Sequence, residues 1–172
     1  MAIAVALWEA LKPEFKELNK QIKINANHLA QELKKLWFNL VSWGTENHLI
    51  LVNVGRWRWI FLQEALDKAW ITLNKNTIPQ DPATAFNPSW IRMWTPILTM
   101  RWMKEKEMEK VAKWIKEVSD EVKDFDYSDD KEERKENLKR FYDFINANSK
   151  LKEIRQEIGD LCKEFPIYNY KG

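Results

Sequence analysis

The sequence predicts an all-α protein: an elongated helical bundle of three long and two shorter helices with an apolar N-terminal arm. Apolar residues recur every three or four positions over long stretches of the chain, which is the period of one face of a helix. Only four of the 172 residues are glycine, and tight β-hairpins need the positive φ angles that glycine adopts most readily. Several pairs of a polar residue followed by proline also resemble helix starts.

The first twelve residues are expected to form the arm. Residues 1–8 are apolar without a polar side, and Pro13 separates them from the helix that follows. A free apolar segment is unfavourable in water, so this arm must either fold back onto its own bundle or insert into another subunit. Residues 13–172 are expected to form a single helical-bundle domain. The arm residues that we expect to take part in assembly are Ile3, Val5, Leu7 and Trp8.

The first long helix is predicted from Pro13 to Trp43. Proline is favoured in the first turn of a helix. Gly44 follows the last position directly, as expected for the residue after a helix C-terminus. Nine positions with a mean spacing of about 3.5 residues form one continuous seam: Phe15, Leu18, Ile22, Asn25, Leu29, Leu33, Leu36, Leu40 and Trp43.

The second element is predicted as a helix from about residue 47 to residue 73. Its second half, QEALDKAWITL, is rich in helix-forming residues, and no turn signal lies between residues 55 and 63. Gly55 and the β-branched residues before it are compatible with a strand. Whether residues 49–54 begin this helix or pair as a strand therefore stays open.

Within this element, the stretch VGRWRWIFLQ alternates two arginines with two tryptophans. In a strand the indoles of Trp57 and Trp59 would share one face and the guanidinium groups of Arg56 and Arg58 the other. In a helix the same side chains scatter around the axis. Because the helix is favoured, we expect these residues to lie in a buried helix.

The rest of the chain is predicted as a connector and three further helices. Residues 74–95 are rich in proline and are expected to be irregular, with one or two short helical turns, and a third long helix begins at Pro96. Asp130 is expected to cap the next helix, together with Glu133. The apolar seams of the three helices are Met108, Val111, Ile115, Val118, Val122 and Phe125, then Leu138, Phe141, Tyr142 and Ile145, and finally Leu151, Ile154, Ile158, Leu161 and Phe165.

Composition bounds the environment and the partners. Lys and Arg number 28 against 26 Asp and Glu, so the net charge of +2 alone indicates no class of partner. Cys162 is the only cysteine, which excludes an internal disulfide and a cysteine-rich metal site. No signal peptide or membrane-spanning segment is recognised. An intracellular (cytoplasmic) or virion-associated protein is expected.

Catalytic and metal-binding patterns were not found. The two histidines, His28 and His48, have no nucleophile in a recognisable motif beside them. His28 and Glu32 have the spacing of two metal ligands, but two ligands are too few to specify a site. The acidic turn that starts at Asp124 lacks the glycine and the glutamate of a calcium loop. We therefore expect no enzyme, no cofactor and no metal.

The function expected from these patterns is a non-enzymatic structural subunit: a coat, filament or multi-subunit complex component that associates with itself or with other protein subunits. Ten tryptophans are many for a domain of this size, and aromatic residues are enriched at interfaces. The further assembly candidates, beside the arm, are Trp57, Trp90 and Trp94.

Two alternatives stay open. Arginines next to tryptophans and a lysine stripe could bind nucleic acid, although arginine–indole pairs also form without a ligand. The second alternative is a small-ligand binder or an enzyme with a tryptophan-lined pocket. The nucleic-acid candidates are Arg56, Arg58, Arg92, Arg101, Lys12, Lys16, Lys20 and Lys23.

Overall fold

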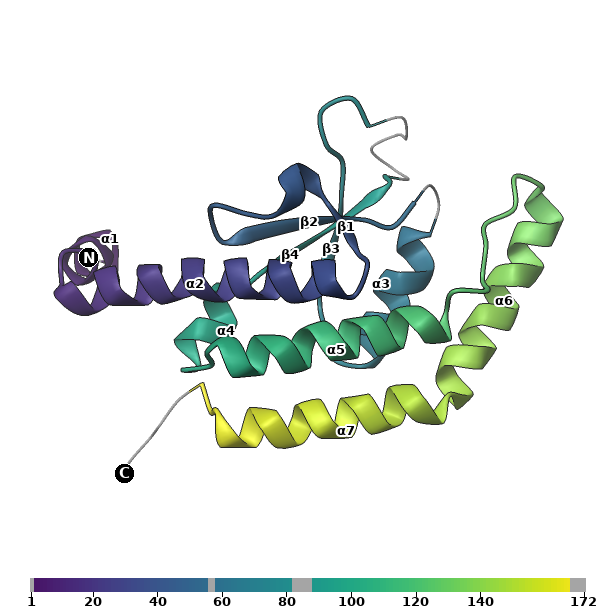
Figure 1. Cartoon of the computed structure of the whole chain (residues 1–172). Helices are drawn as coiled ribbons and strands as arrows, with labels where there is room; N and C mark the ends of the chain where they lie inside the picture. Colours follow the sequence, from purple (N-terminus) through teal and green to yellow (C-terminus); the bar gives the residue numbers. More distant parts are fainter. Residues whose placement is uncertain (1, 56–57, 82–87, 168–172) are drawn as a thin grey trace.

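The fold combines a β-sheet with helices. The structure, a computed structural model, describes residues 2–55, 58–81 and 88–167. It contains a four-stranded antiparallel sheet, so the all-α prediction is wrong (Figure 1). The strands have the order β1-β2-β4-β3 across the sheet, and they are β1 (Asn39–Leu40), β2 (Leu49–Asn53), β3 (Asn74–Asn76) and β4 (Trp90–Trp94).

Strand β2 replaces the first third of the predicted second helix. Ile50 and Val52 are buried while their neighbours are half-buried, which is the alternation of a strand with one face on a core. Every residue of β2 pairs with a residue of β4, some forty positions further along the chain. The helix begins only at Trp59, after Arg58. Residues 56 and 57 lie outside the described residues, so the expected buried helix for RWRW is tested only at its end, where Arg58 is exposed and Trp59 is half-buried.

The helices form rows beside the sheet. Helix α2 packs along α5, and α5 packs along α7, while α3 lies between the sheet and the ends of these rows (Figure 1). Helix α1 projects from the far end of α2, away from the sheet. The helices are α1 (Ala2–Ala10), α2 (Pro13–Lys35), α3 (Trp59–Lys68), α4 (Pro96–Met100), α5 (Glu105–Glu121), α6 (Lys131–Ala147) and α7 (Ser149–Glu164), with a 3-10 turn η1 (Val41–Trp43).

Three predicted helices end earlier than their apolar spacing indicates. Helix α3 ends at Lys68, although the second element was predicted to reach residue 73. Helix α2 starts at Pro13 as predicted but ends at Lys35, because the chain reverses through Trp37 and places Leu40 in the sheet. The third long helix is two helices, α4 and α5, joined by a reversal at Trp102.

The last two helices, α6 and α7, are confirmed. The Asp130 carboxylate accepts hydrogen bonds from the backbone N–H groups of Glu132 and Glu133, so the predicted cap of α6 is confirmed. The Glu133 carboxylate accepts from the Ser128 hydroxyl at 2.6 Å, outside the predicted capping box.

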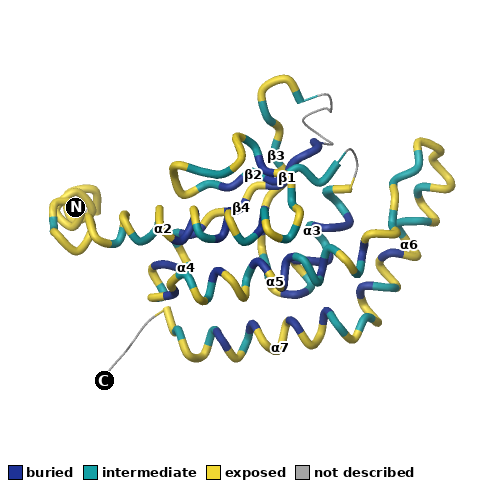
Figure 2. Tube along the Cα trace, viewed as in Figure 1, coloured by how far each residue is buried: buried dark blue, intermediate teal, exposed yellow. Residues whose placement is uncertain are grey.

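The core lies where the helix rows meet one face of the sheet. Leu29 and Leu33 of α2, Ile50 of β2, Ile91 of β4 and Met108 of α5 belong to one continuous buried cluster. Figure 2 shows buried residues along the inner sides of α2, α5 and α7 and in the strands. The described α-helices lie on one side of the sheet, and none of them covers the opposite face (Figure 1).

Candidate functional site at the outer face of the sheet

Arg92 stands at the centre of the uncovered face of the sheet, here called the outer face. Its neighbours in β4, Ile91 and Met93, are buried in the core, while Arg92 is exposed. Successive strand residues point to opposite faces, so the Arg92 side chain projects from the outer face. In the register of the sheet, Arg92 pairs with Leu51 of β2 and with Asn74 of β3.

The other residues on the outer face follow from the same register. Trp90 pairs with Asn53 and Asn76, and Trp94 pairs with Leu49. The Trp94 side chain is 59% exposed and its ring lies 6.4 Å from that of His48, whereas Trp90 is buried. The outer face therefore combines one exposed guanidinium group with carboxamides and the exposed indole of Trp94.

Arg92 differs from the other described arginines in having no internal partner. Within residues 2–55, 58–81 and 88–167, its guanidinium group makes no hydrogen bond, ion pair or ring contact, while each of the others makes at least one. Arg58 and Arg101 donate to backbone carbonyls, and the remaining three contact aromatic rings or a tyrosine hydroxyl, namely Arg134, Arg140 and Arg155. A guanidinium group on a rigid strand without an internal anion is a binding group for an external carboxylate or phosphate.

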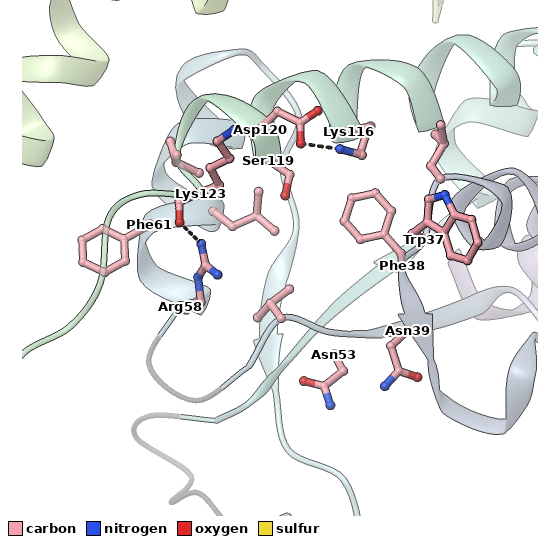
Figure 3. Close-up of a pocket in the computed structure, with 14 residues that line it drawn as sticks. Trp37, Phe38, Asn39, Asn53, Arg58, Phe61, Lys116, Ser119, Asp120 and Lys123 are labelled. Atoms are coloured by element: carbon pink, nitrogen blue, oxygen red, sulfur yellow. Dashed lines mark hydrogen bonds and ion pairs between the residues drawn. The ribbon is translucent and has the colours of Figure 1, made fainter.

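A separate cavity of about 330 Å³ lies where β2, the start of α3 and the end of α5 meet (Figure 3). Arg58 reaches into it and donates to the backbone carbonyl of Lys123, and Lys116 pairs with Asp120. Trp37 and Phe38 lie at the other side of the cavity. Arg58 and Lys116 therefore already have partners within the chain, unlike Arg92.

The predicted nucleic-acid candidates are not brought together. Arg101 lies at the end of α4 and donates from Nε to the Phe165 carbonyl and from Nη2 to the Cys162 carbonyl, both at 2.7 Å. Arg58 lies near the end of α5, and Arg56 lies outside the described residues. The lysine stripe follows the N-terminal half of α2, at Lys12, Lys16, Lys20 and Lys23. Together with Arg92 on β4, the described candidates belong to four separate regions, so they form no single patch.

The predicted assembly candidates fall into two groups. Helix α1 has no buried residue, and its apolar side chains are at least half exposed: Ile3, Val5, Leu7 and Trp8. Trp90 and Trp94 belong instead to β4, and Trp57 lies outside the described residues. The arm therefore does not fold back onto the described core, and its apolar side chains stay exposed among the residues that the structure describes.

His28 lies beside two glutamates, but they do not make a metal site. His28 Nε2 lies 3.1 Å from Glu109 Oε1 across the α2–α5 contact and 3.9 Å from Glu32 Oε1. No group of three possible metal ligands occurs among the residues that the structure describes. None of the described helices is long and apolar enough to cross a membrane.

Comparison with known proteins decides the family. Residues 1–115 match the family model described as serine hydroxymethyltransferase. The chain belongs to the serine hydroxymethyltransferase family. It is 36% identical over 171 residues to the serine hydroxymethyltransferase of Idiomarina loihiensis, which covers 96% of this chain and 34% of that protein. It is 48% identical over 127 residues to that of Acidothermus cellulolyticus, covering 70% of this chain and 29% of that protein.

Membership of this family of enzymes overturns the expected function. The expectations of a non-enzymatic structural subunit and of a protein that is not an enzyme are wrong. The chain spans about a third of the length of the curated relatives it matches. No finding supports a nucleic-acid partner or a place in a virion.

The sequence analysis selected Arg92 as a nucleic-acid candidate, a class of partner that no finding supports. Arg92 was noticed because Trp90 and Trp94 flank it, which suggested stacking on bases. Its partners in register, Leu51 and Asn74, were missed because they belong to strands distant in sequence.

Proposed function

We propose that this chain forms one section of a serine hydroxymethyltransferase and that Arg92 binds the carboxylate of the amino-acid substrate. The relatives are named for the transfer of a hydroxymethyl group involving serine. Serine carries an α-carboxylate, and a guanidinium group can donate two parallel hydrogen bonds to a carboxylate. The observation that carries the proposal is the exposed guanidinium group of Arg92 on the outer face, without an internal partner.

The strand holds Arg92 firmly enough for this role. β4 is hydrogen-bonded to β2 on one side and to β3 on the other, so the backbone at Arg92 is fixed on both sides. A binding group on a rigid element loses less entropy when its ligand arrives. Asn74, in register with Arg92, brings a carboxamide to the same face, and its N–H groups supply further donors for an anion.

The cofactor of the family is held elsewhere in this proposal. Serine hydroxymethyltransferases use pyridoxal phosphate, which such enzymes hold through a lysine. Lys75 of β3 pairs in register with buried Ile91, and its Nζ lies 4.5 Å from the centroid of the Trp59 ring, on the opposite side of the sheet from Arg92. The described residues around Arg92 therefore do not fit a lysine-bound cofactor, and we assign this chain no step through it.

The exposed surface of α1 supports association with the rest of the enzyme. Its apolar side chains need a partner, and the relatives are about three times longer than the section matched here. We propose that α1 packs against the remaining part of the enzyme or a second copy of it, in the cytoplasm. The single, unpaired cysteine, Cys162, is consistent with that compartment.

A chimeric enzyme tests this proposal. This chain replaces the matching section of the Acidothermus cellulolyticus enzyme, and the cleavage of serine is measured. Activity above that of the same enzyme without any replacement section supports the family role. In the active chimera, Arg92→Ala should raise the KM for serine roughly 10- to 100-fold, the loss expected when a charged hydrogen-bonding partner is removed.

The matched control is Arg140→Ala. Arg140 is exposed on α6, and its guanidinium carbon lies 5.5 Å from the centroid of the Phe125 ring, so its loss removes the same charge at a distance from the outer face. An unchanged KM in Arg92→Ala, or an equal rise in both variants, would reject the assignment of Arg92. An inactive chimera that is folded would reject the role of the whole section.

A further inference from the structure

Three helices of this chain end in the same geometry, and each places a tryptophan in the left-handed conformation. Trp37 follows α2, Trp70 follows α3 and Trp102 follows α4, each with φ at 68°. In this region of φ the Cβ atom of an ordinary residue approaches its own backbone carbonyl, and bulky residues there are rare. A tryptophan at all three sites needs an explanation.

The hydrogen bonds identify the geometry. After each helix, the N–H of the left-handed residue donates to the carbonyl three positions back, and the next N–H donates to the carbonyl five positions back. The bonds to the carbonyl three positions back are Trp37 to Lys34 (3.0 Å), Trp70 to Asp67 (3.0 Å) and Trp102 to Thr99 (2.9 Å). The bonds to the carbonyl five positions back are Phe38 to Leu33 (3.0 Å), Ile71 to Leu66 (2.8 Å) and Met103 to Leu98 (3.2 Å). This is the Schellman motif, whose left-handed position is usually occupied by glycine.

The indoles gain little from these positions. The Trp37 side chain is 92% exposed and that of Trp102 is 78% exposed. Trp70 is 56% exposed, with the Arg155 guanidinium carbon 4.2 Å from its ring centroid. Trp43, at the end of η1, is likewise an exposed tryptophan in the left-handed region, with φ at 59° and 80% exposure. Strain in the backbone is therefore not offset by burial of the side chain.

The distribution of residue types points in the same direction. Six described residues other than glycine have positive φ, and four of them are tryptophan. Glycine is only 4 of 172 residues, about 2% against the usual content of about 7%. The chain thus lacks glycine and has tryptophan where the backbone requires glycine.

Trp114 shows the contrast. It lies inside α5, is buried, and its Nε1 donates to Glu157 Oε2 at 2.6 Å. A buried indole with its N–H satisfied is the ordinary environment of tryptophan. Trp114 therefore suits its site, whereas the four tryptophans with positive φ do not suit theirs.

We propose that positions 37, 43, 70 and 102 are glycine in the protein as its own organism makes it, because their codon is UGA and is read there as glycine. UGA is a stop codon in the standard genetic code and is reassigned in some lineages, to tryptophan in some of them and to glycine in others. Trp114 is specified by UGG, which encodes tryptophan in the standard code and also where UGA is read as glycine. The native helix ends then carry the residue that the Schellman motif favours, and the strain disappears.

The gene and the native protein test this directly. The codons at positions 37, 43, 70 and 102 should be UGA, and the codon at position 114 should be UGG. Mass spectrometry of peptides from the native protein should give the mass of glycine at the first four positions and of tryptophan at Trp114. A UGG codon at any of positions 37, 43, 70 and 102, or a native peptide with tryptophan there, would overturn the proposal.

A recombinant test separates strain from the presence of the indole. Trp37→Gly, Trp70→Gly and Trp102→Gly are each compared with the alanine variant of the same residue, since alanine removes the indole but keeps the Cβ atom. Each glycine variant should have a Tm about 2–4 °C above its alanine counterpart. Trp114→Gly should lower the Tm. Glycine variants that are no more stable than the alanine variants would contradict the geometric basis of the proposal.

Discussion

Asn25 donates a hydrogen bond from Nδ2 to Thr99 Oγ1 at 2.9 Å, inside the core between α2 and α4. The same amide nitrogen donates to the Met103 carbonyl at 2.9 Å. Asn25 was expected in the apolar seam of the first helix, and the structure shows why a polar residue is tolerated there. It connects α2 to the α4–α5 junction by bonds that water does not reach.

Removing this amide should destabilise the fold. Asn25→Ala leaves the Met103 carbonyl and the Thr99 hydroxyl without a donor, so the free energy of unfolding should fall by about 2 kcal/mol. Urea denaturation measures the change. Asn27→Ala is the control, because Asn27 is exposed on the same helix and its Nδ2 lies 3.5 Å from the Thr45 carbonyl. Equal losses in both variants would show that the buried bonds contribute nothing specific.

The Asp160 carboxylate should give a small dependence of stability on pH. Hydrogen bonds from Lys163 and Gln156 lower its pKa below the usual value of 3.8. A carboxylate whose pKa is lower in the folded state stabilises the fold above the unfolded pKa and loses this contribution as the pH falls through the folded pKa. Asp160→Asn should thus be less stable than the parent chain at pH 7, and the difference should vanish as the pH falls below the folded pKa.

Thermal denaturation at several pH values measures this difference. Asp143→Asn, which changes an exposed carboxylate on α6, is measured in parallel as the control for the loss of one negative charge. A constant difference between Asp160→Asn and the parent chain at all pH values would contradict the assignment to the Lys163 and Gln156 hydrogen bonds.

Deletion of α1 should weaken association without lowering the stability of the fold. None of its described residues is buried, so deletion of residues 2–10 should leave the Tm unchanged within about 2 °C. In the chimeric enzyme, where this section is covalently joined to the rest, the same deletion should weaken the association of one copy with a second, which sedimentation velocity measures. A large fall in the Tm of the isolated chain would instead make α1 part of the fold.

The long helices could be predicted from the sequence because their signals are local. Pro13 marks the start of α2, Asp130 marks the start of α6, and a period of three to four residues runs through both. The sheet could not be predicted in this way. β2 and β4 have five residues each, too few for a clear period, and their pairing joins segments about forty residues apart.

The ends of α2 and α4 were predicted wrongly for a different reason. Trp37 and Trp102 stand at left-handed positions where glycine would have marked the end of α2 and of α4. Without that signal, the apolar spacing continued through both reversals, and Leu40 was assigned to a helix instead of the sheet. Tryptophan at these positions also lowers the number of glycines in the sequence. The all-α prediction depended partly on that low number.

Arg92 could be selected as a candidate site residue from the sequence, but its neighbours in the folded chain could not. The exposed position of Arg92 on a two-sided strand, and its register with Asn74, depend on the pairing of three strands. The absence of an internal partner for its guanidinium group, within the described residues, also depends on the folded chain. The ligand class follows from that isolation and from the family, neither of which is visible in a short motif.

The central claim is that Arg92 binds the substrate carboxylate, and the most direct measurement compares serine with serinamide, which lacks that charge. In the active chimera, kcat/KM should favour serine over serinamide, and Arg92→Ala should reduce this preference roughly 10- to 100-fold by losing activity toward serine alone. If Arg92→Ala lowers kcat/KM for both compounds by the same factor, Arg92 does not recognise the carboxylate and the account is wrong.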